Sequence, residues 1–343
     1  VQGIAMPVRM KDIADRLGIS VVTVSRALRN RPDIAAETKA RVLECAERLN
    51  YRPNLMARSL VTGRSSLIGL VVPDLIHPFL TEIAKELSVS LRKRNYFLIV
   101  SSTESDPKLE QDQIEHMLAQ HVDCLVVASC QQNSKALYKI GQVGVPLVLI
   151  DRSFQKFSSN FVGVDDYRIG ELATEHLIAQ GYKCIAHIRG PETTCGNRRL
   201  EGYRDAIRRQ GLPVSESYVI ACGGETDSDG EVKGAQAMGE ILALRPRPDA
   251  IFCFNDSIAL GAMVKAFEAG LHIPEDVAIV GCGNFHYSSK LRVPLSSIDQ
   301  KARELGERAA KMVISILARS SSTRTRNVFL EPELVIRESS RAH

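Results

Sequence analysis

The sequence contains no run of about 18 apolar residues, which is the length that a membrane-spanning helix needs. The first residues also lack the hydrophobic region of an export signal. The eight cysteines are scattered singly, without C-x-x-C spacing, and this pattern is typical of buried thiols in a reducing compartment rather than of a zinc site or a disulfide framework. These absences predict a cytoplasmic protein that has no membrane contact.

The sequence also lacks the motifs of the common catalytic and cofactor-binding sites. No G-x-x-x-x-G-K-[ST] string is present, no G-x-G-x-x-G follows a strand, and no H-E-x-x-H or other paired-histidine spacing offers a metal site. Residues 225–230 imitate the start of a calcium loop, but the twelfth position of that loop would be Gln236, which cannot supply a bidentate carboxylate. We therefore expect no metal, no cofactor and no enzymatic activity.

Charge is distributed unevenly over the 343 residues, a length that suits two or three domains. Residues 1–66 contain 12 Lys and Arg against 6 Asp and Glu, whereas the remaining residues contain 32 against 34. A basic first segment on a nearly neutral remainder favours a polyanion as the partner of that segment alone. The alternative is that these are the solvated basic side chains that small helical domains often carry.

Residues 10–29 have the pattern of two short helices joined by a tight turn. The first helix has one apolar face, made of Ile13, Ala14 and Leu17. Gly18 follows where helices commonly end in a left-handed residue, and Ser20 is suited to cap the next helix. The second helix buries Val24, Ala27 and Leu28, which leaves on its solvent side Val21, Val22, Ser25, Arg26 and Arg29. A helix with small, apolar and basic side chains at its exposed N-terminal end can enter the major groove of DNA, so the sequence predicts a helix-turn-helix.

A third helix is expected over residues 35–50, and Pro53 ends it because the residue before a proline avoids helical geometry. Asn54 can cap a further short helix at residues 55–61. Two helical turns are marginal in water, so this segment is a plausible switch that is ordered only when something holds it.

From Ser66 onward, short β-branched runs alternate with helical stretches. The runs are continuously apolar, as in buried parallel strands, at residues 68–74, 97–102, 124–129, 146–151, 184–190, 250–256 and 277–283. Helices are expected between them at residues 79–94, 108–120, 133–143, 167–180, 199–210, 230–244 and 257–269. Two successive arrays of this kind predict two doubly wound layers with a cleft between them. Ligands of such sheets bind at the carboxyl ends of strands, where the candidates are Asp74, Asp151, Arg152, Asn255, Asp256 and Asn284.

Several strings together resemble the lactose-repressor and galactose-repressor family of bacterial transcription regulators, over essentially the whole chain. They are MKDIADRLGISVVTVSRAL, NYRPNLMARSLVTGRSSLIGLVVPD, FNDSIALGA, DVAIVG and ELVIRESS. The resemblance implies an N-terminal all-α helix-turn-helix headpiece at residues 6–53 and a hinge helix and linker at residues 54–65. It also implies an α/β core of two doubly wound subdomains, similar to periplasmic binding proteins, at residues 66–343.

In that family the chain crosses between the two core subdomains three times. The crossings are expected near Val164, Arg292 and Thr325. The N-subdomain would then comprise about residues 66–163 and 293–324, and the C-subdomain about residues 164–292 and 325–343.

The resemblance assigns DNA-binding roles by position. Val21 and Val22 occupy the base-choosing positions and can touch thymine methyl groups, and Arg26 matches an arginine that reads guanine. Phosphate contacts suit Ser20, Thr23 and Ser25, whereas Arg29 stands where the family often has Asn and its contact is less defined. In the hinge, Asn54 is the cap, Ala57 allows two hinge helices to approach, and Leu60 matches a leucine that wedges into the minor groove. The alternative for Leu60 is an ordinary buried leucine.

The resemblance also points to an effector site in the cleft. Phe79 could stack on a ring-shaped ligand, and polar contacts are expected from Asp151, Arg152, Arg199 and Asn255. One departure concerns an aspartate that relatives carry in GYDN or GFDD, since the string here is GCGN and Gly283 replaces it. Gly283 would make room, Asn284 could compensate, and the ligand could differ from that of relatives. The alternative for each cleft residue is a structural role in its loop.

The sequence thus predicts a homodimeric repressor that binds a pseudo-palindromic DNA operator under the control of a small molecule, a sugar or sugar derivative, bound in the core cleft. Two other interpretations are a solute-binding protein of a transport system, which the basic head opposes, and a sugar-modifying enzyme, which the missing catalytic constellation opposes.

Overall fold

The computed structural model describes residues 8–52, 63–154, 156–222, 229–318 and 325–341. The chain divides into two compact units, Val1–Ser65 and Ser66–His343. We call the first the headpiece and the second the core. No helix of the described residues is long and apolar enough to cross a membrane.

The headpiece contains the helices α1 (Met10–Leu17), α2 (Val21–Leu28) and α3 (Ala36–Arg48). Gly18 ends α1 in the left-handed conformation, with φ of 65°, as its position predicts. The three helices enclose a small apolar core made of Ile13, Ala14, Val24, Ala27, Val42, Cys45 and Ala46. The predicted helix-turn-helix is therefore present, with a third helix closing its core.

The core contains two six-stranded sheets among the described residues. The first has the order β11-β5-β4-β3-β1-β2 and is parallel throughout. Its strands are β1 (Leu67–Val72), β2 (Phe97–Ser102), β3 (Cys124–Val127), β4 (Leu147–Ile150), β5 (Asn160–Val164) and β11 (Asn327–Leu330). Its helices are α5 (Pro78–Arg92), α6 (Pro107–Ala119), α7 (Lys135–Val143) and α12 (Ala302–Leu317). We call this sheet with its helices the N-subdomain.

The second sheet has the order β12-β10-β9-β8-β6-β7, and only the pairing of β12 with β10 is antiparallel within the described strands. Its strands are β6 (Ile185–Arg189), β7 (Val219–Ala221), β8 (Ala250–Cys253), β9 (Ala278–Cys282), β10 (Ser296–Asp299) and β12 (Glu333–Val335). Its helices are α8 (Asp166–Ala179), α9 (Thr194–Arg209), α10 (Gly230–Ala243) and α11 (Asp256–Glu268). Short 3₁₀ turns lie at Glu216–Tyr218 and Glu338–Ser340. We call this sheet with its helices the C-subdomain.

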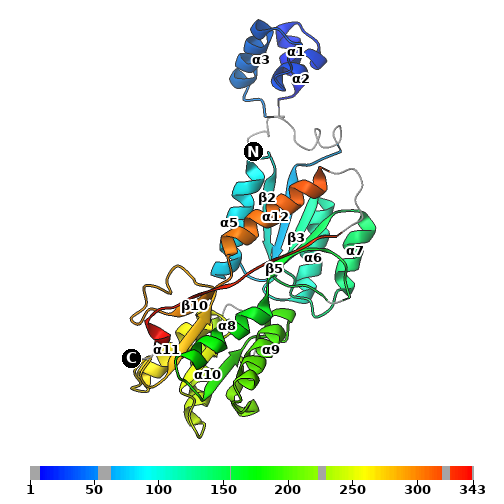
Figure 1. Cartoon of the computed structure of the whole chain (residues 1–343). Helices are drawn as coiled ribbons and strands as arrows, with labels where there is room; N and C mark the ends of the chain where they lie inside the picture. The colour runs from blue at the N-terminus through cyan, green and yellow to red at the C-terminus, as the bar shows by residue number, and fades with distance from the viewer. Residues whose placement is uncertain (1–7, 53–62, 155, 223–228, 319–324, 342–343) are drawn as a thin grey trace, which may run out of the picture. The chain divides into compact units, whose positions relative to one another are not determined.

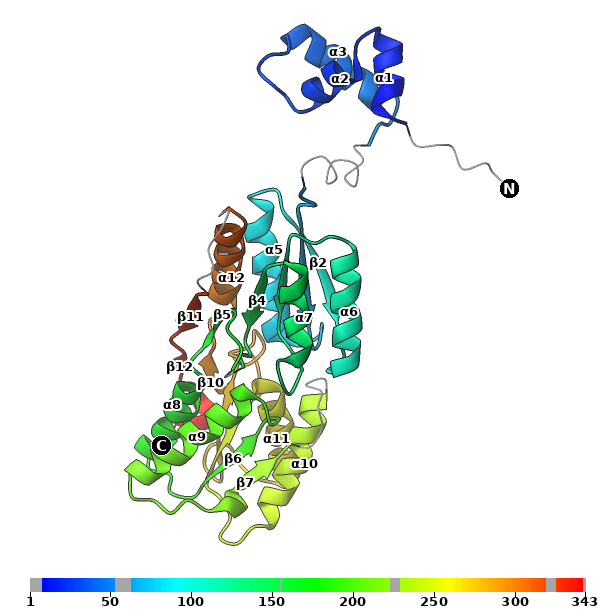
Figure 2. The same cartoon turned by 90° about the vertical axis from the view of Figure 1, so that its right-hand side faces the viewer.

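Each sheet is covered by helices on both faces, which explains the continuously apolar strands. In the N-subdomain, α5 and α12 cover one face and α6 and α7 the other (Figure 2). Alternate residues of β1 follow this division, because Ile68 and Leu70 contact the first helix pair and Val71 the second. In the C-subdomain, α8 packs against α9 and α10 against α11 on opposite faces (Figure 1).

The strand β2 was expected to be buried like the others, and this prediction was wrong. It lies at the edge of its sheet, where Phe97 and Val100 are exposed. A continuously apolar run does not distinguish a central strand from an edge strand, because the position in the sheet depends on the pairing of distant segments.

The first crossing between the subdomains lies where it was expected, since β5 ends at Val164 in the N-subdomain and α8 begins at Asp166 in the C-subdomain. The other two lie later than predicted. The strand β10 still belongs to the C-subdomain sheet, so the chain crosses between Asp299 and Ala302 rather than near Arg292. The strand β11 pairs with β5, so the last crossing lies between Leu330 and Glu333 rather than near Thr325.

Candidate functional site

The helix α2 is fixed by a serine cap at its N-terminus. The hydroxyl oxygen of Ser20 accepts a hydrogen bond from the backbone N–H of Thr23 at 3.0 Å, and the two hydroxyl oxygens lie 2.9 Å apart. Such a cap stabilises a helix by about 1 kcal/mol, which matters for a helix of only 8 residues. The cap therefore holds the N-terminal turn that would face DNA.

The solvent face of α2 is the one predicted from the sequence. The side chains of Val21 and Val22 are 41% and 63% exposed, although valine is usually buried. Arg26 and Arg29 are exposed as well, Ser25 is half-buried, and Val24 and Ala27 lie in the headpiece core. The helix thus presents apolar, hydroxyl and basic groups on one accessible surface.

Arg26 is held by an acidic residue that sequence reasoning missed. Its Nη1 donates to Oδ2 of Asp33 at 2.8 Å, and the two side chains are 58% and 47% exposed. An ion pair this exposed stabilises by only about 0.2–1 kcal/mol, so the guanidinium can exchange Asp33 for another acceptor. Asp33 lies in the turn that follows α2, seven residues after Arg26. Helical spacing therefore does not predict this ion pair.

The hinge residues Asn54, Ala57 and Leu60 lie outside the described residues. Their DNA-binding roles therefore stay predictions.

In the core, five of the seven predicted effector residues meet in one place. Phe79, Asp151, Arg152, Arg199 and Asn255 all line a small cavity of about 30 Å³, which we call the inner pocket. They come from both subdomains, from α5, from the end of β4, from α9 and from the end of β8. The strand-end rule therefore selected residues that converge only in the tertiary structure.

Arg199 is the most firmly held of these residues. Its side chain is buried, its Nε donates to Oδ1 of Asp166 at 2.8 Å, and its Nη1 donates to the Phe254 carbonyl oxygen at 2.7 Å. The guanidinium carbon also lies 4.5 Å from the centre of the Phe254 ring. These contacts position a fixed positive charge in the wall of the inner pocket.

Asn255 caps α11 through its side-chain oxygen, and its side-chain nitrogen does not take part in the cap. Its Oδ1 accepts a hydrogen bond from the backbone N–H of Ile258 at 2.9 Å. Its Nδ2 is buried and has no hydrogen-bond partner among the described residues. Leaving a buried polar group unsatisfied costs about 1–3 kcal/mol, so a ligand acceptor in the inner pocket would remove that cost.

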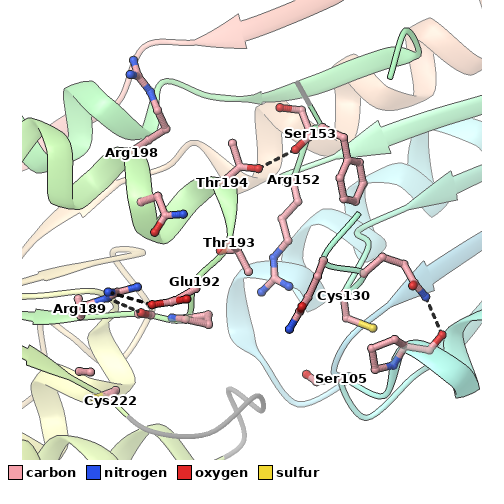
Figure 3. A pocket seen from close by; sticks show the side chains of 18 residues that line it. Ser105, Cys130, Arg152, Ser153, Arg189, Glu192, Thr193, Thr194, Arg198 and Cys222 are labelled. Atoms are coloured by element: carbon pink, nitrogen blue, oxygen red, sulfur yellow. Dashed lines mark hydrogen bonds and ion pairs between the residues drawn. The ribbon is translucent and has the colours of Figure 1, made fainter. Parts of the chain in front are cut away.

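A larger cavity of about 690 Å³, the outer pocket, also lies between the two subdomains (Figure 3). Arg152 lines both pockets, and its side chain points toward the middle of the outer one. Thr194 bridges the subdomains at the rim, where its hydroxyl donates to the Ser153 carbonyl oxygen at 2.6 Å. The two pockets together can accept a ligand that contacts both subdomains at once.

Two of the thiols in the pocket walls, those of Cys195 and Cys130, have raised pKa values and are protonated at neutral pH. Burial raises the pKa of Cys195 in the inner pocket well above its ordinary value, and the charge of Asp151 adds to this effect. Burial, together with Glu110, raises the pKa of Cys130 in the outer pocket to about 12. A thiol is a poor nucleophile, so these cysteines suit a binding site better than a covalent mechanism. In the part of the chain that the structure describes, no His, Cys, Asp and Glu side chains gather as a metal site.

Comparison with known proteins identifies both units. The family model "Bacterial regulatory proteins, lacI family" matches residues 9–54, and the model "Periplasmic binding proteins and sugar binding domain of LacI family" matches residues 65–337. The chain belongs to the LacI family. Over 332 residues it is 31% identical to the HTH-type transcriptional repressor PurR of Pasteurella multocida (strain Pm70). The aligned region covers 96% of this chain and 98% of PurR.

Two solved structures resemble the chain over nearly its full length. The lac repressor dimer bound to operator and the anti-inducer ONPF has a TM-score of 0.85 and 25% identity, covering 98% of this chain and 100% of that one. The complex of the transcriptional regulator CelR with cellobiose has a TM-score of 0.73 and 27% identity, covering 97% of this chain and 99% of that one. This LacI-family chain is a DNA-binding transcriptional repressor with an effector-binding domain, and neither a transport protein nor an enzyme.

Two predicted effector residues of this LacI-family repressor are not brought to the inner pocket. Gly283 and Asn284 line a separate cavity of about 500 Å³. Gly283 has φ of 126°, and a Cβ there would lie 2.3 Å from the Phe285 ring, so this glycine makes room for a neighbouring ring rather than for a ligand. Asn284 does not compensate for the missing aspartate, because its Oδ1 accepts from Arg337 Nη2 at 2.6 Å and its Nδ2 donates to Asp299 Oδ2 at 3.2 Å.

Sequence reasoning missed Arg189 of the outer pocket and both His77 and Gln300 of the inner pocket. Arg189 is the last residue of β6, so the strand-end rule applied to this strand would have found it. Gln300 follows β10, a strand that the sequence did not predict, and no comparable signal marked it.

Proposed function

We propose that this LacI-family repressor binds a pseudo-palindromic operator as a homodimer, with α2 of each headpiece in a major groove. The observation that carries the proposal is the exposed face of α2, where Val21, Val22 and Arg26 lie together beside a capped N-terminus. The solved lac repressor dimer on its operator supports the same arrangement. Since operator DNA is in the cytoplasm, we place the protein there as part of this proposal.

Each side chain of that face has a role that follows from its chemistry. Val21 and Val22 contact thymine methyl groups but make no hydrogen bonds to base edges, and Arg26 donates to O6 and N7 of guanine. The hydroxyl groups of Ser20, Thr23 and Ser25 donate hydrogen bonds to DNA phosphates, and Arg29 adds a contact to the DNA sugar–phosphate backbone. Sequence preference is then expected to come mainly from three side chains.

The hinge part of the proposal rests on the resemblance of residues 54–61 to the family. Asn54 caps the hinge helix, Ala57 permits the close approach of its dimer mate, and Leu60 wedges into the central minor groove. Unstacking a base step costs a few kcal/mol, which the contacts of the bent operator must offset.

We further propose that a carbohydrate or carbohydrate derivative binds in the cleft and changes operator affinity. The sugar-binding family model and the CelR complex with cellobiose support this class of ligand. Asp151 is suited to accept hydrogen bonds from ligand hydroxyls, Arg152, Arg199 and Asn255 are suited to donate, and Phe79 is suited to stack on a sugar ring. The inner pocket of about 30 Å³ holds roughly one water, so a sugar can enter only if the walls move apart.

That movement provides the coupling between effector and operator. A ligand that binds one arrangement of the subdomains better than the other shifts the equilibrium between them by its differential affinity. Coupling energies of this kind are typically about 1–3 kcal/mol, so operator affinity would change about 5- to 150-fold.

The DNA-binding part is tested by selecting bound fragments from a genomic library with the full chain and measuring their affinity by fluorescence anisotropy. We expect a preference of about 10³-fold or more for a two-fold symmetric site over random DNA. The logarithm of the affinity should also fall linearly with the logarithm of the salt concentration. No preference for any fragment, or a flat salt response, would contradict the proposal.

The effector part is tested with Asn255→Ser. Serine can still cap α11 by accepting from the Ile258 N–H, but it lacks the amide donor of Asn255. We expect unchanged operator binding without ligand and a loss of about tenfold in effector affinity, measured by the effector concentration that alters anisotropy. The control is Asn133→Ser, an exposed position outside both pockets whose Oδ1 likewise accepts from a backbone N–H, that of Lys135 at 3.1 Å, and no such loss is expected for it. Equal responses of wild type and Asn255→Ser would place the effector elsewhere.

A further inference from the structure

The outer pocket is lined by more basic than acidic side chains. Arg152 follows β4 of the N-subdomain, and Arg189 ends β6 of the C-subdomain, so each sheet delivers one arginine to the same cavity. Among the described lining residues the only carboxylate is Glu192, whose side chain is 85% exposed. Two enclosed arginines therefore line the cavity together with one acid that lies in solvent, and a second acid, Asp151, lies beside Arg152 outside the lining.

Arg189 is poorly satisfied for a side chain that is only 15% exposed. Its Nη1 lies 3.5 Å from Glu192 Oε1, and its Nε donates to the Gly190 carbonyl oxygen at 3.3 Å. Its Nη2 is buried and has no partner among the described residues. Guanidinium–carboxylate contacts normally measure about 2.7–2.9 Å, so Arg189 is held loosely and still has a donor to offer.

Arg152 faces Arg189 from the other subdomain. Its side chain is 11% exposed, and its contacts include the Ser129 carbonyl oxygen at 3.4 Å and Asp151 Oδ2 at 3.9 Å. Figure 3 shows its guanidinium extending into the pocket, whereas Arg198, on α9 of the C-subdomain, turns away.

The backbone adds to the positive potential on the C-subdomain side of the pocket, where Arg189 lies. The helix α9 begins at Thr194 in the pocket lining, with Thr193 as its cap. The N-terminus of a helix carries roughly half a positive charge and favours anions. A ligand with only hydroxyl groups would bring no negative charge to these groups, whereas an anion could accept a hydrogen bond from the buried Nη2 of Arg189.

We propose that the effector carries an anionic group, a phosphate or a carboxylate, which Arg152 and Arg189 hold between the two subdomains. The inference rests on the proposed function, since it names the class of ligand that the cleft binds. The anionic group lies in the outer pocket, and the hydroxyl-bearing part lies toward Asp151 and Asn255 in the inner pocket. Because the two arginines belong to different subdomains, the anion links them and couples its own binding to their relative position.

The experiment compares neutral sugars with their charged counterparts on the full chain. Aldopentoses and aldohexoses are screened by thermal shift beside their phosphates in one arm and their uronic acids in another, and binders are titrated calorimetrically. We expect a charged sugar to bind at least about tenfold more tightly than its neutral parent, and the arm that contains it identifies phosphate or carboxylate. Tighter binding of a neutral parent, or no binding in either charged arm, would overturn the proposal.

Variants then test the arginines themselves. Arg189→Gln should weaken the charged sugar about 10- to 100-fold and leave neutral sugars unaffected, because it removes one charged hydrogen-bond donor. Arg189→Lys keeps the charge and should retain part of the affinity, which separates loss of charge from misfolding. The matched control is Arg198→Gln, whose guanidinium pairs with Glu201, and it should change affinity less than threefold. Equal losses in Arg189→Gln and Arg198→Gln would also overturn the proposal.

The two proposals fail in different ways. If a neutral sugar binds in the cleft and alters operator affinity, the proposed function stands and the anionic effector is wrong. If a charged sugar binds through Arg189 but never alters operator affinity, the ligand class stands and effector control is wrong.

Discussion

Replacement of Arg26 by alanine should strongly reduce the preference for operator while leaving general DNA binding largely intact. In the free headpiece Arg26 pairs with Asp33 at 2.8 Å on the surface, an interaction of about 0.2–1 kcal/mol. A bidentate contact between arginine and guanine discriminates by about 1–3 kcal/mol. The guanine contact is the stronger one, so Arg26 should leave Asp33 when it meets its base.

Both protomers carry the substitution, and a pseudo-palindrome has two half-sites. The loss for the specific site is therefore about 2–6 kcal/mol, which is at least about 30-fold in affinity. Asp33→Asn should act in the opposite direction, because it removes the competing acceptor. The Asp33→Asn variant should bind the operator more tightly by at most about 1 kcal/mol per half-site. This increase in affinity should vanish in the Arg26→Ala background, since the two residues are coupled.

The assay is anisotropy of a labelled operator and of a scrambled duplex at one salt concentration, for the four members of the double-mutant cycle. Arg48→Ala is the matched control, because Arg48 is an exposed headpiece arginine that pairs with Glu44 at 2.6 Å but lies on α3. It should lower specific and nonspecific binding equally and slightly. If Arg26→Ala also lowered specific and nonspecific affinity equally, Arg26 would contact phosphate only. The proposal that Arg26 on α2 contacts guanine would then be refuted.

Three further outcomes are expected. Leu60→Ala should cost operator affinity much more than affinity for random DNA, and equal losses in a gel-shift titration would show that no wedge forms. Burial lowers the pKa of His187 to about 3, so the folded state keeps it neutral while the unfolded chain protonates it below pH 6.5. The contribution of neutral His187 to the free energy of unfolding is therefore fully present above pH 6.5. It falls by roughly 1.4 kcal/mol per pH unit as the pH drops toward 3. Chemical denaturation measures the free energy of unfolding at pH 7 and at pH 5, and the difference between the two values should be smaller in His187→Phe than in the wild type. Gly283→Ala should lower the melting temperature because of its φ of 126° and the Phe285 ring, whereas Gly239→Ala in open space on α10 should raise it slightly. An unchanged melting temperature for Gly283→Ala would contradict the steric argument.

The local pattern of the chain predicted most helices of both units, although it did not predict α12. The 3.6-residue spacing predicted which side of α2 is buried, and the cap at Ser20 formed as expected. Uninterrupted apolar runs located seven of the described strands, because strands covered on both faces need no polar side. The strand-end rule then selected Asp151, Arg152 and Asn255, which meet in the inner pocket.

The errors share one cause, which is dependence on pairing between distant segments. Five described strands were not predicted: β5, β7, β10, β11 and β12. They are short or partly polar, and they are strands because neighbouring segments supply their hydrogen bonds. Once β10 was missed, the crossings near Arg292 and Thr325 were placed too early. Gly283 was assigned to the ligand because nothing local shows that Phe285 folds back beside it.

The sequence alone determined what kind of protein this is, since helix spacing, caps, charge distribution and family motifs are local properties of the chain. Only the tertiary structure decided which charges share a cavity. Arg152 and Arg189 are separated by more than thirty residues and belong to different sheets, and their enclosure in one pocket arises because the two subdomains face each other. Ligand chemistry depends on such convergence in space, which no linear pattern records.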